Sequence, residues 1–232
     1  MSLTGSSASP DAREPGRAIP VTVTLRPIAS GLPLGFFGLV GAATLVGAQA
    51  YGFLPARAGV AIGLLLIPTA VAQLVGGISA ILARTVIGAS LMMTFSGVWL
   101  GTALVFLVHP PYATVTLAIW YLSLSAVIVC FLSSVTGKLA IAFVPISGLP
   151  AFVVSAVWLL APSRSLGHAA GVLTFVLAFA GLYAALSLLL EDARRRTVLP
   201  TLRRGPMKKV FTGDFDSQLE GVEHEAGVRR YL

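Results

Sequence analysis

No aspartate or glutamate occurs between Glu14 and Glu191, a stretch that makes up most of this 232-residue chain. Apolar residues make up 56% of the chain, charged residues make up 11%, and the mean hydropathy is +0.89. A soluble domain of this length needs a surface with interspersed charges of both signs, which this stretch cannot supply. The chain is therefore predicted to be a membrane protein.

The few basic residues divide the apolar stretch into charge-free windows, and the lengths of these windows set the number of membrane spans. Four windows hold 25 to 30 residues, which is enough for one spanning helix each. The window from 85 to 137 is long enough for two helices and is divided at His109-Pro110-Pro111, because proline disrupts a helix. The fold class is thus predicted to be all-α, a bundle of six transmembrane helices. Their expected bounds are 33–54, 59–82, 86–107, 112–135, 139–161 and 167–190.

The distribution of basic residues predicts the orientation of this bundle. Six spans place both termini on one side of the membrane, together with the loops that contain Arg84 and Lys138. That side holds 14 of the 16 Lys and Arg residues, and the other side holds only Arg57 and Arg164. Because short basic loops stay in the cytoplasm, we predict cytoplasmic termini in a plasma (inner) membrane. The net charge of +7 then reflects topology and contact with anionic lipid rather than nucleic-acid binding.

Three parts of the chain are expected from composition. Residues 1–29, rich in Ser, Pro and Arg, are expected to form a disordered N-terminal arm. Residues 30–190 form the transmembrane domain, and residues 191–232 form a basic juxtamembrane segment and a cytoplasmic tail. The lone Cys130 predicts neither a disulfide nor a thiolate metal site.

Small residues recur at helical spacing in two of the predicted spans. The first span contains Gly35, Gly38 and Gly41, and the sixth contains Gly167, Gly171, Thr174, Ala178, Gly181 and Ala185. In lipid such faces bring helix backbones close together, so tight packing is the favoured interpretation and the lining of a narrow pore is the alternative.

Prolines mark one helix start and several interruptions. Pro33 suits the first turn of a helix, where the amide groups have no partner within the helix and can face an anion. Pro68, Pro145 and Pro150 lie inside predicted spans, and the stretch "PISGLP" (145–150) is expected to interrupt its helix.

Polar side chains inside the predicted spans are few. They are Gln49, Gln73, Ser90, Thr94, Ser96, Ser147, Ser155 and Tyr183. Each is more typical of a hydrogen bond between helices than of a ligand site. Ser90, Thr94, Gly97 and Gly101 share one helix face, which predicts a polar surface of small residues on the third span. His109 and His168 are expected at outer helix ends.

The motifs that enzymes use are missing from the sequence. The apolar stretch contains no paired carboxylate, no His-x-x-x-His, no Gly-x-Ser-x-Gly and no phosphate-binding loop. We therefore expect no enzyme activity, no metal and no cofactor. Cation channels and pumps usually hold an acidic residue in the membrane, so an interior without one suits a neutral or anionic solute.

Several stretches resemble the acetate uptake transporter family, of the succinate-acetate permease type. Residues 30–36, "SGLPLGF", are similar to the family signature Asn-Pro-Ala-Pro-Leu-Gly-Leu, with Pro33, Leu34 and Gly35 matching. Further similar stretches are "AQLVGG" (72–77), "GASLMMTFSGVWL" (88–100) and "RTVLP" (196–200). The resemblance covers roughly residues 30–200.

This resemblance implies a six-helix protomer, assembled as a hexamer, with a path through each protomer for acetate and similar short carboxylates together with a proton. It places the constriction at Leu39, Phe95 and Gly148. Candidate path or motif residues are Pro33, Gly35, Gln49, Gln73, Ser90, Thr94 and Tyr183. Where the family has Glu and then Asn near the end of the second span, this chain has Ala80 and Thr85.

The predicted function is a transmembrane transporter or channel for acetate or a similar small monocarboxylate, with proton co-transport. The expected partners are the carboxylate solute, the lipid bilayer and further copies of the chain. Alternatives are a membrane accessory or signalling protein without transport activity, a transporter of another small solute such as ammonium, and an intramembrane enzyme.

Overall fold

The computed structural model describes residues 30–83, 85–134, 139–194 and 196–200, which form six α-helices and one short 3-10 helix. The elements are α1 (Leu32–Tyr51), η1 (Ala56–Ala58), α2 (Gly59–Leu82), α3 (Val86–Val108), α4 (Ala113–Ser134), α5 (Leu139–Leu160) and α6 (Arg164–Arg194). All six α-helices are long and apolar enough to cross a membrane. The prediction of six spans is confirmed. The predicted N-terminal arm, the tail beyond residue 200, Arg84 and Lys138 lie outside the described residues.

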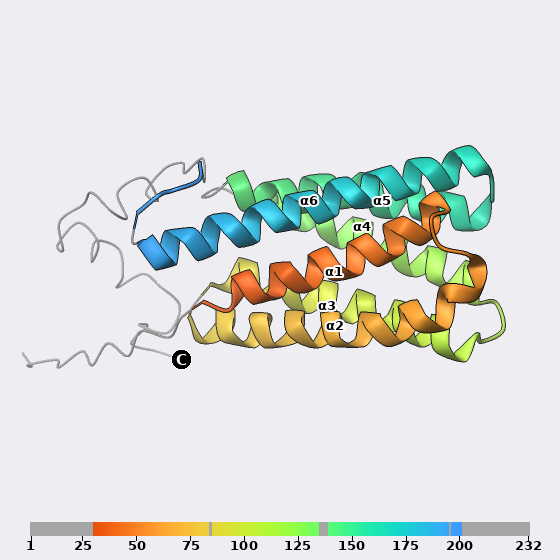
Figure 1. Cartoon of the computed structure of the whole chain (residues 1–232), viewed down its shortest axis with the longest axis horizontal. Coiled ribbons are helices and arrows are strands. Elements are labelled where there is room, and N and C mark those ends of the chain that lie inside the picture. Colours follow the sequence, from red (N-terminus) through yellow and green to blue (C-terminus); the bar gives the residue numbers. More distant parts are fainter. Residues whose placement is uncertain (1–29, 84, 135–138, 195, 201–232) are drawn as a thin grey trace, which may run out of the picture.

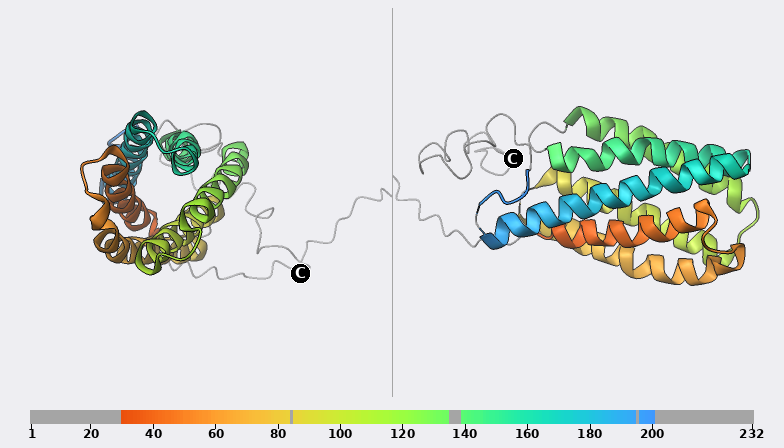
Figure 2. Two further views of the ribbon diagram at one scale, coloured as in Figure 1. Left: turned by 90° about the vertical axis from the view of Figure 1, so that its right-hand side faces the viewer. Right: turned by 45° about the horizontal axis from the view of Figure 1, so that its top comes forward.

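The helices run alternately up and down and form one bundle (Figure 1). The start of α1 and the end of α6 lie at the same end, which we call the terminal end. The connections α1–α2, α3–α4 and α5–α6 lie at the opposite end, which we call the distal end. Viewed along the bundle, the helices follow one another around a ring, and α6 closes it by packing on α1 (Figure 2). Side chains that point into the ring form the core.

The ends of α1 follow from two residues with special backbone properties. Pro33 lies in the first turn, as predicted, where its missing N–H removes no helical hydrogen bond. Gly52 has φ 94°, a left-handed conformation that favours glycine, and caps the helix through backbone bonds to Ala48 and Gln49. The helix therefore ends at Tyr51 rather than at residue 54. The helix α6 is longer at both ends than the predicted span 167–190, because it begins at Arg164 and ends at Arg194.

Glycines allow α1 to lie directly against its two neighbours. A Cβ atom on Gly76 of α2 would lie only 2.8 Å from the Gly31 carbonyl oxygen and 2.9 Å from the Gly35 nitrogen. A Cβ atom on Gly171 of α6 would lie 2.8 Å from the Tyr51 nitrogen. The prediction that the small-residue faces serve tight packing is confirmed for these contacts. The start of α1 therefore packs against α2.

The expected break at "PISGLP" is wrong, because α5 continues as a helix through Pro145 and Pro150. Membrane helices tolerate proline where hydroxyl groups and local adjustments provide new partners for the backbone carbonyl groups. In α5 the Ser147 hydroxyl donates hydrogen bonds to the carbonyl oxygens of Phe143 at 2.7 Å and Val144 at 3.1 Å. This hydroxyl therefore gives hydrogen bonds to the carbonyl groups of the two residues that precede Pro145.

Candidate functional site

A cavity of about 490 Å³ opens at the distal end of the bundle, and we call it the distal vestibule. It lies between the ends of α1 and α5 and the start of α6. Its lining residues are Gln49, Ala50, Tyr51, Gly52, Trp158, Pro162, Ser163, Arg164, Gly167 and His168. Three helix ends thus contribute polar groups to one cavity.

The distal vestibule is electrically positive. Arg164 is exposed, and no acidic residue exists between Glu14 and Glu191 to neutralise it. The first turn of α6 adds the positive end of a helix dipole. This turn is ordered by the Ser163 hydroxyl, which accepts a hydrogen bond from the Leu166 amide at 3.2 Å. The His168 ring stacks on Tyr51 with a centroid separation of 4.7 Å.

A second cavity of about 120 Å³ shares Gln49, Ala50 and Trp158 with the vestibule, and we call it the inner pocket. The remaining lining residues are Val46, Phe106, Leu117, Tyr121, Ser155 and Leu159. Since α1, α3, α4 and α5 all contribute, the inner pocket lies inside the ring. Most of its lining is apolar, so it offers a polar solute few groups beyond Gln49, Tyr121 and Ser155.

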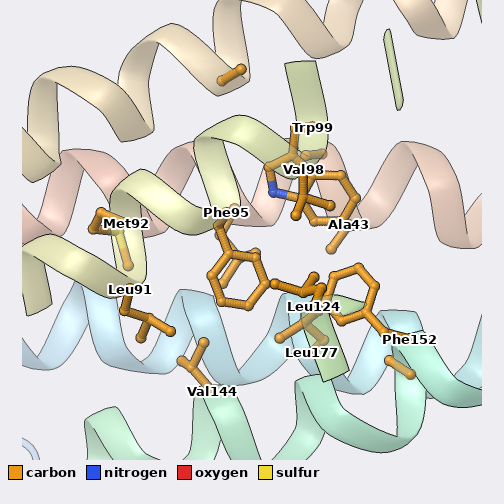
Figure 3. Close-up of a cluster of buried hydrophobic side chains, with 14 of the residues drawn as sticks. Ala43, Leu91, Met92, Phe95, Val98, Trp99, Leu124, Val144, Phe152 and Leu177 are labelled. Carbon is orange, nitrogen blue, oxygen red and sulfur yellow. The ribbon is translucent and has the colours of Figure 1, made fainter. Parts of the chain in front are cut away.

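Four aromatic rings pack together in the core, and one of them also lines the inner pocket; we call them the aromatic layer. They are Phe95 and Trp99 of α3, Tyr121 of α4 and Phe152 of α5. The Phe152 ring is central, with centroids 5.8 Å from Phe95, 5.8 Å from Trp99 and 5.4 Å from Tyr121. Figure 3 shows Phe95, Trp99 and Phe152 gathered in the core. Because Tyr121 belongs to both, the inner pocket is in contact with the aromatic layer at this ring.

Two of the three predicted constriction residues lie side by side. A Cβ atom on Gly148 would lie 3.6 Å from Phe95 Cζ, with Ile128 and Leu177 at 3.5 and 3.7 Å. Leu39 is fully buried in the same core, where its Cδ2 lies 3.1 Å from a Cβ atom placed on Gly181. The structure therefore joins Gly148 to the aromatic layer, and places Leu39 on the α1–α6 contact.

Buried polar groups without a hydrogen-bond partner among the described residues occur in two side chains of α2 and α3. The first is the Gln73 side chain of α2, both of whose amide atoms are buried. The second is the indole N–H of Trp99, within the aromatic layer. A buried donor or acceptor without a partner is unfavourable and calls for an explanation in each case.

Other predicted residues lie away from the cavities. Ser90 is exposed and Thr94 half-buried, so the polar face predicted on α3 lies at the outside of the bundle. The Tyr183 hydroxyl donates a hydrogen bond to the Pro200 carbonyl oxygen at 2.8 Å and ties "RTVLP" to α6. Gly35 packs against Gln73 and Met92. Ser96 donates to the Ala70 carbonyl at 2.8 Å, an interhelical bond of the expected kind.

Sequence reasoning missed most of the aromatic layer, although helical spacing held part of the signal. Trp99 follows Phe95 by four residues and therefore lies on the same face of α3. In the same way, Phe152 and Ser155 follow Gly148 by four and seven residues on α5. Once Phe95 and Gly148 are candidates, helical spacing therefore points to Trp99, Phe152 and Ser155 as residues on the same helix faces. No spacing along the chain connects Tyr121 to them.

The fold and cavities define a class of protein, a six-helix membrane bundle with two adjoining cavities toward its distal end. The same fold occurs in the bacterial acetate channel SatP, with a TM-score of 0.68 at 20% sequence identity. The match covers 75% of this chain and 98% of that channel. No family model matches the chain, and no curated protein matches its sequence. The likeness at this identity establishes the shared fold.

Proposed function

We propose that this chain is a transmembrane channel or transporter for a small monocarboxylate such as acetate, of the acetate uptake transporter type. One observation carries the proposal. The distal vestibule and the inner pocket adjoin each other and lead toward the aromatic layer inside a bundle with the fold of an acetate channel. A positive mouth attracts an anion, and the absence of acidic residues between Glu14 and Glu191 disfavours a cation pathway.

The aromatic layer, with Gly148 and Leu39, is the proposed constriction. An apolar neck excludes hydrated ions because their water is not replaced by polar groups. A carboxylic acid that enters in its neutral form avoids most of this desolvation cost. The indole N–H of Trp99 then offers a hydrogen bond to the acid, since it has no partner among the described residues.

Proton co-transport is the mechanism that this constriction favours. The chain has no carboxylate between Glu14 and Glu191, and the two on α6, Glu191 and Asp192, lie in its last turn at the terminal end, so the proton travels on the solute itself. A lower external pH raises the neutral fraction of the acid outside. Uptake should therefore rise as the external pH falls, and it should survive substitution of His109 and His168 one at a time.

Orientation and assembly complete the proposal. The excess of basic residues at the terminal end supports cytoplasmic termini, which places the distal vestibule at the outer face. The outer surface of the bundle carries many exposed apolar side chains, such as Leu64, Ile119 and Phe179, which suit lipid or neighbouring protomers. We propose a hexamer on the basis of the family resemblance.

Uptake into liposomes tests the function directly. Purified protein is reconstituted and offered labelled acetate, lactate, succinate or ammonium, with protein-free liposomes as the control. Saturable acetate uptake that unlabelled monocarboxylates inhibit is the expected result. Uptake of ammonium alone would support the other transporter function. No uptake of any solute by correctly folded protein would contradict transport and favour an accessory role, in which deletion of residues 201–232 abolishes activity in cells.

A further inference from the structure

We infer that the distal vestibule is a binding site for a small carboxylate anion, in which Arg164 is the counter-charge and Gln49 guides the solute inward. The inference rests on the proposed function, because the solute that is bound here as an anion then takes up a proton from the solution and enters the bundle as the neutral acid. It assigns binding to a cavity at the mouth, separate from the constriction at Phe95 and Gly148.

The charge distribution at the distal end supports an anionic ligand. Among the described residues, the basic ones at this end are Arg57 on η1 and Arg164 at the start of α6. Arg164 lines the vestibule, and Arg57 is absent from its lining. The chain has no carboxylate between Glu14 and Glu191 that could pair with Arg164 here. The counter-charge must therefore come from a ligand or from the solution.

The position of Arg164 on its helix strengthens this point. A cation at the first residue of a helix lies beside the positive end of the helix dipole, where it is electrostatically unfavourable. The guanidinium group and the dipole thus both add positive potential to one concave space. The negative charge of a bound carboxylate would offset the positive potential of both groups. The two parallel N–H donors of the guanidinium group also match the two oxygens of a carboxylate.

The inner pocket indicates the chemistry of the part of the ligand that does not carry the charge. Gln49 lines both cavities, so its amide lies where a solute passes from one to the other. Beyond it lie apolar side chains such as Val46, Leu117 and Leu159. A short monocarboxylate can place its charged head in the vestibule and its alkyl group toward this pocket. A dicarboxylate would have to bring a second charge into an apolar space, which is costly.

The chain offers a closely matched pair of variants to test this site. Arg164→Gln and Arg57→Gln each remove one exposed positive charge from the same end, but only the first changes the vestibule. Both proteins are placed in nanodiscs of zwitterionic lipid, and equilibrium binding of labelled propionate is measured. Uptake into liposomes is measured over a range of propionate concentrations. Arg164→Gln should weaken binding and raise the half-saturation concentration about 3- to 10-fold, as expected for a partly screened ionic contact. Arg57→Gln should leave both values near those of the unmodified protein.

The outcomes separate this inference from the proposed function. Equal binding by the two variants would overturn the site, even if the protein transports propionate. Propionate binding that depends on Arg164, without any uptake, would support the site and contradict transport. Neither binding nor uptake of propionate by the unmodified protein would overturn both. If Arg164→Gln changes only the response to added anionic lipid, the cavity holds a lipid headgroup and the inference is wrong.

Discussion

Replacing Gly148 with leucine tests whether the aromatic layer limits the size of the solute. A Cβ atom at this position makes ordinary contacts of 3.5 to 3.7 Å with Ile128, Phe95 and Leu177. The next carbon of a longer side chain lies about 1.5 Å farther out, so it would approach one of these atoms to about 2 Å. The favourable contact distance is about 3.5 to 4.0 Å. Leucine must therefore displace the Phe95 ring or another neighbour, whereas alanine fits.

The size of the effect follows from the cost of overpacking. Added bulk in a well-packed core costs about 1 to 3 kcal/mol. If this energy adds to the barrier for passage of the solute through the constriction, transport slows about 5- to 150-fold, because about 1.4 kcal/mol corresponds to a factor of ten in rate. A four-carbon acid needs more room than acetate, so butyrate uptake should fall more steeply. Gly148→Ala should leave the uptake of both acids close to that of the unmodified protein.

The assay compares initial uptake rates of acetate and butyrate into liposomes, normalised to folded protein from size-exclusion chromatography. Gly97→Leu is the matched control, because a Cβ atom on this exposed α3 glycine has no neighbour within 4 Å. Equal loss of acetate and butyrate uptake in Gly148→Leu would refute the size argument. Unchanged uptake of both would show that Gly148 lies off the path.

Three further predictions concern the aromatic layer and the helix contacts. Phe152→Ala should raise the leak of small solutes, because it removes the central ring of the layer; it should destabilise the fold by about 3 to 5 kcal/mol, and a tight but less stable variant would argue against a gate. Trp99→Phe keeps a ring but removes the buried indole N–H, so acid uptake should fall while the unfolding midpoint stays near its original value; unchanged uptake would show that no solute uses this donor. Gly76→Ala forces a methyl group to within 3 Å of backbone atoms at Gly31 and Gly35 and should destabilise the fold by at least about 1 to 3 kcal/mol, whereas an unfolding midpoint equal to that of Gly97→Ala would contradict the close packing of α1 on α2.

The number and length of the spans could be predicted because the bilayer fixes how long an apolar helix must be. The positions of Arg57, His109 and Arg164 divided the apolar stretch at the connections seen in the structure. The small-residue face of α6 was also predicted, since close contact between helices in lipid requires small side chains. These features depend on local sequence and on the solvent alone.

The direction in which each helix faces could not be predicted in the same way. In a soluble protein the polar face of a helix marks the outside, but here all faces are apolar and lipid gives no contrast. The polar face of Ser90 and Thr94 therefore resembled an interior surface, although it lies at the outside. The aromatic layer joins Phe95, Tyr121 and Phe152 from three helices, so only the tertiary packing brings them together.

The central claim is that the solute passes through the interior of the protomer, from the distal vestibule through the inner pocket. The most direct test places a cysteine at Ser155, which lines the inner pocket, in a Cys130→Ser background. The modified protein is treated in liposomes with a small, negatively charged, membrane-impermeant thiol reagent, and acetate uptake is then measured. We expect the reagent to block uptake, and an excess of propionate to slow the modification. Complete modification of this cysteine with no loss of acetate uptake would contradict the claim.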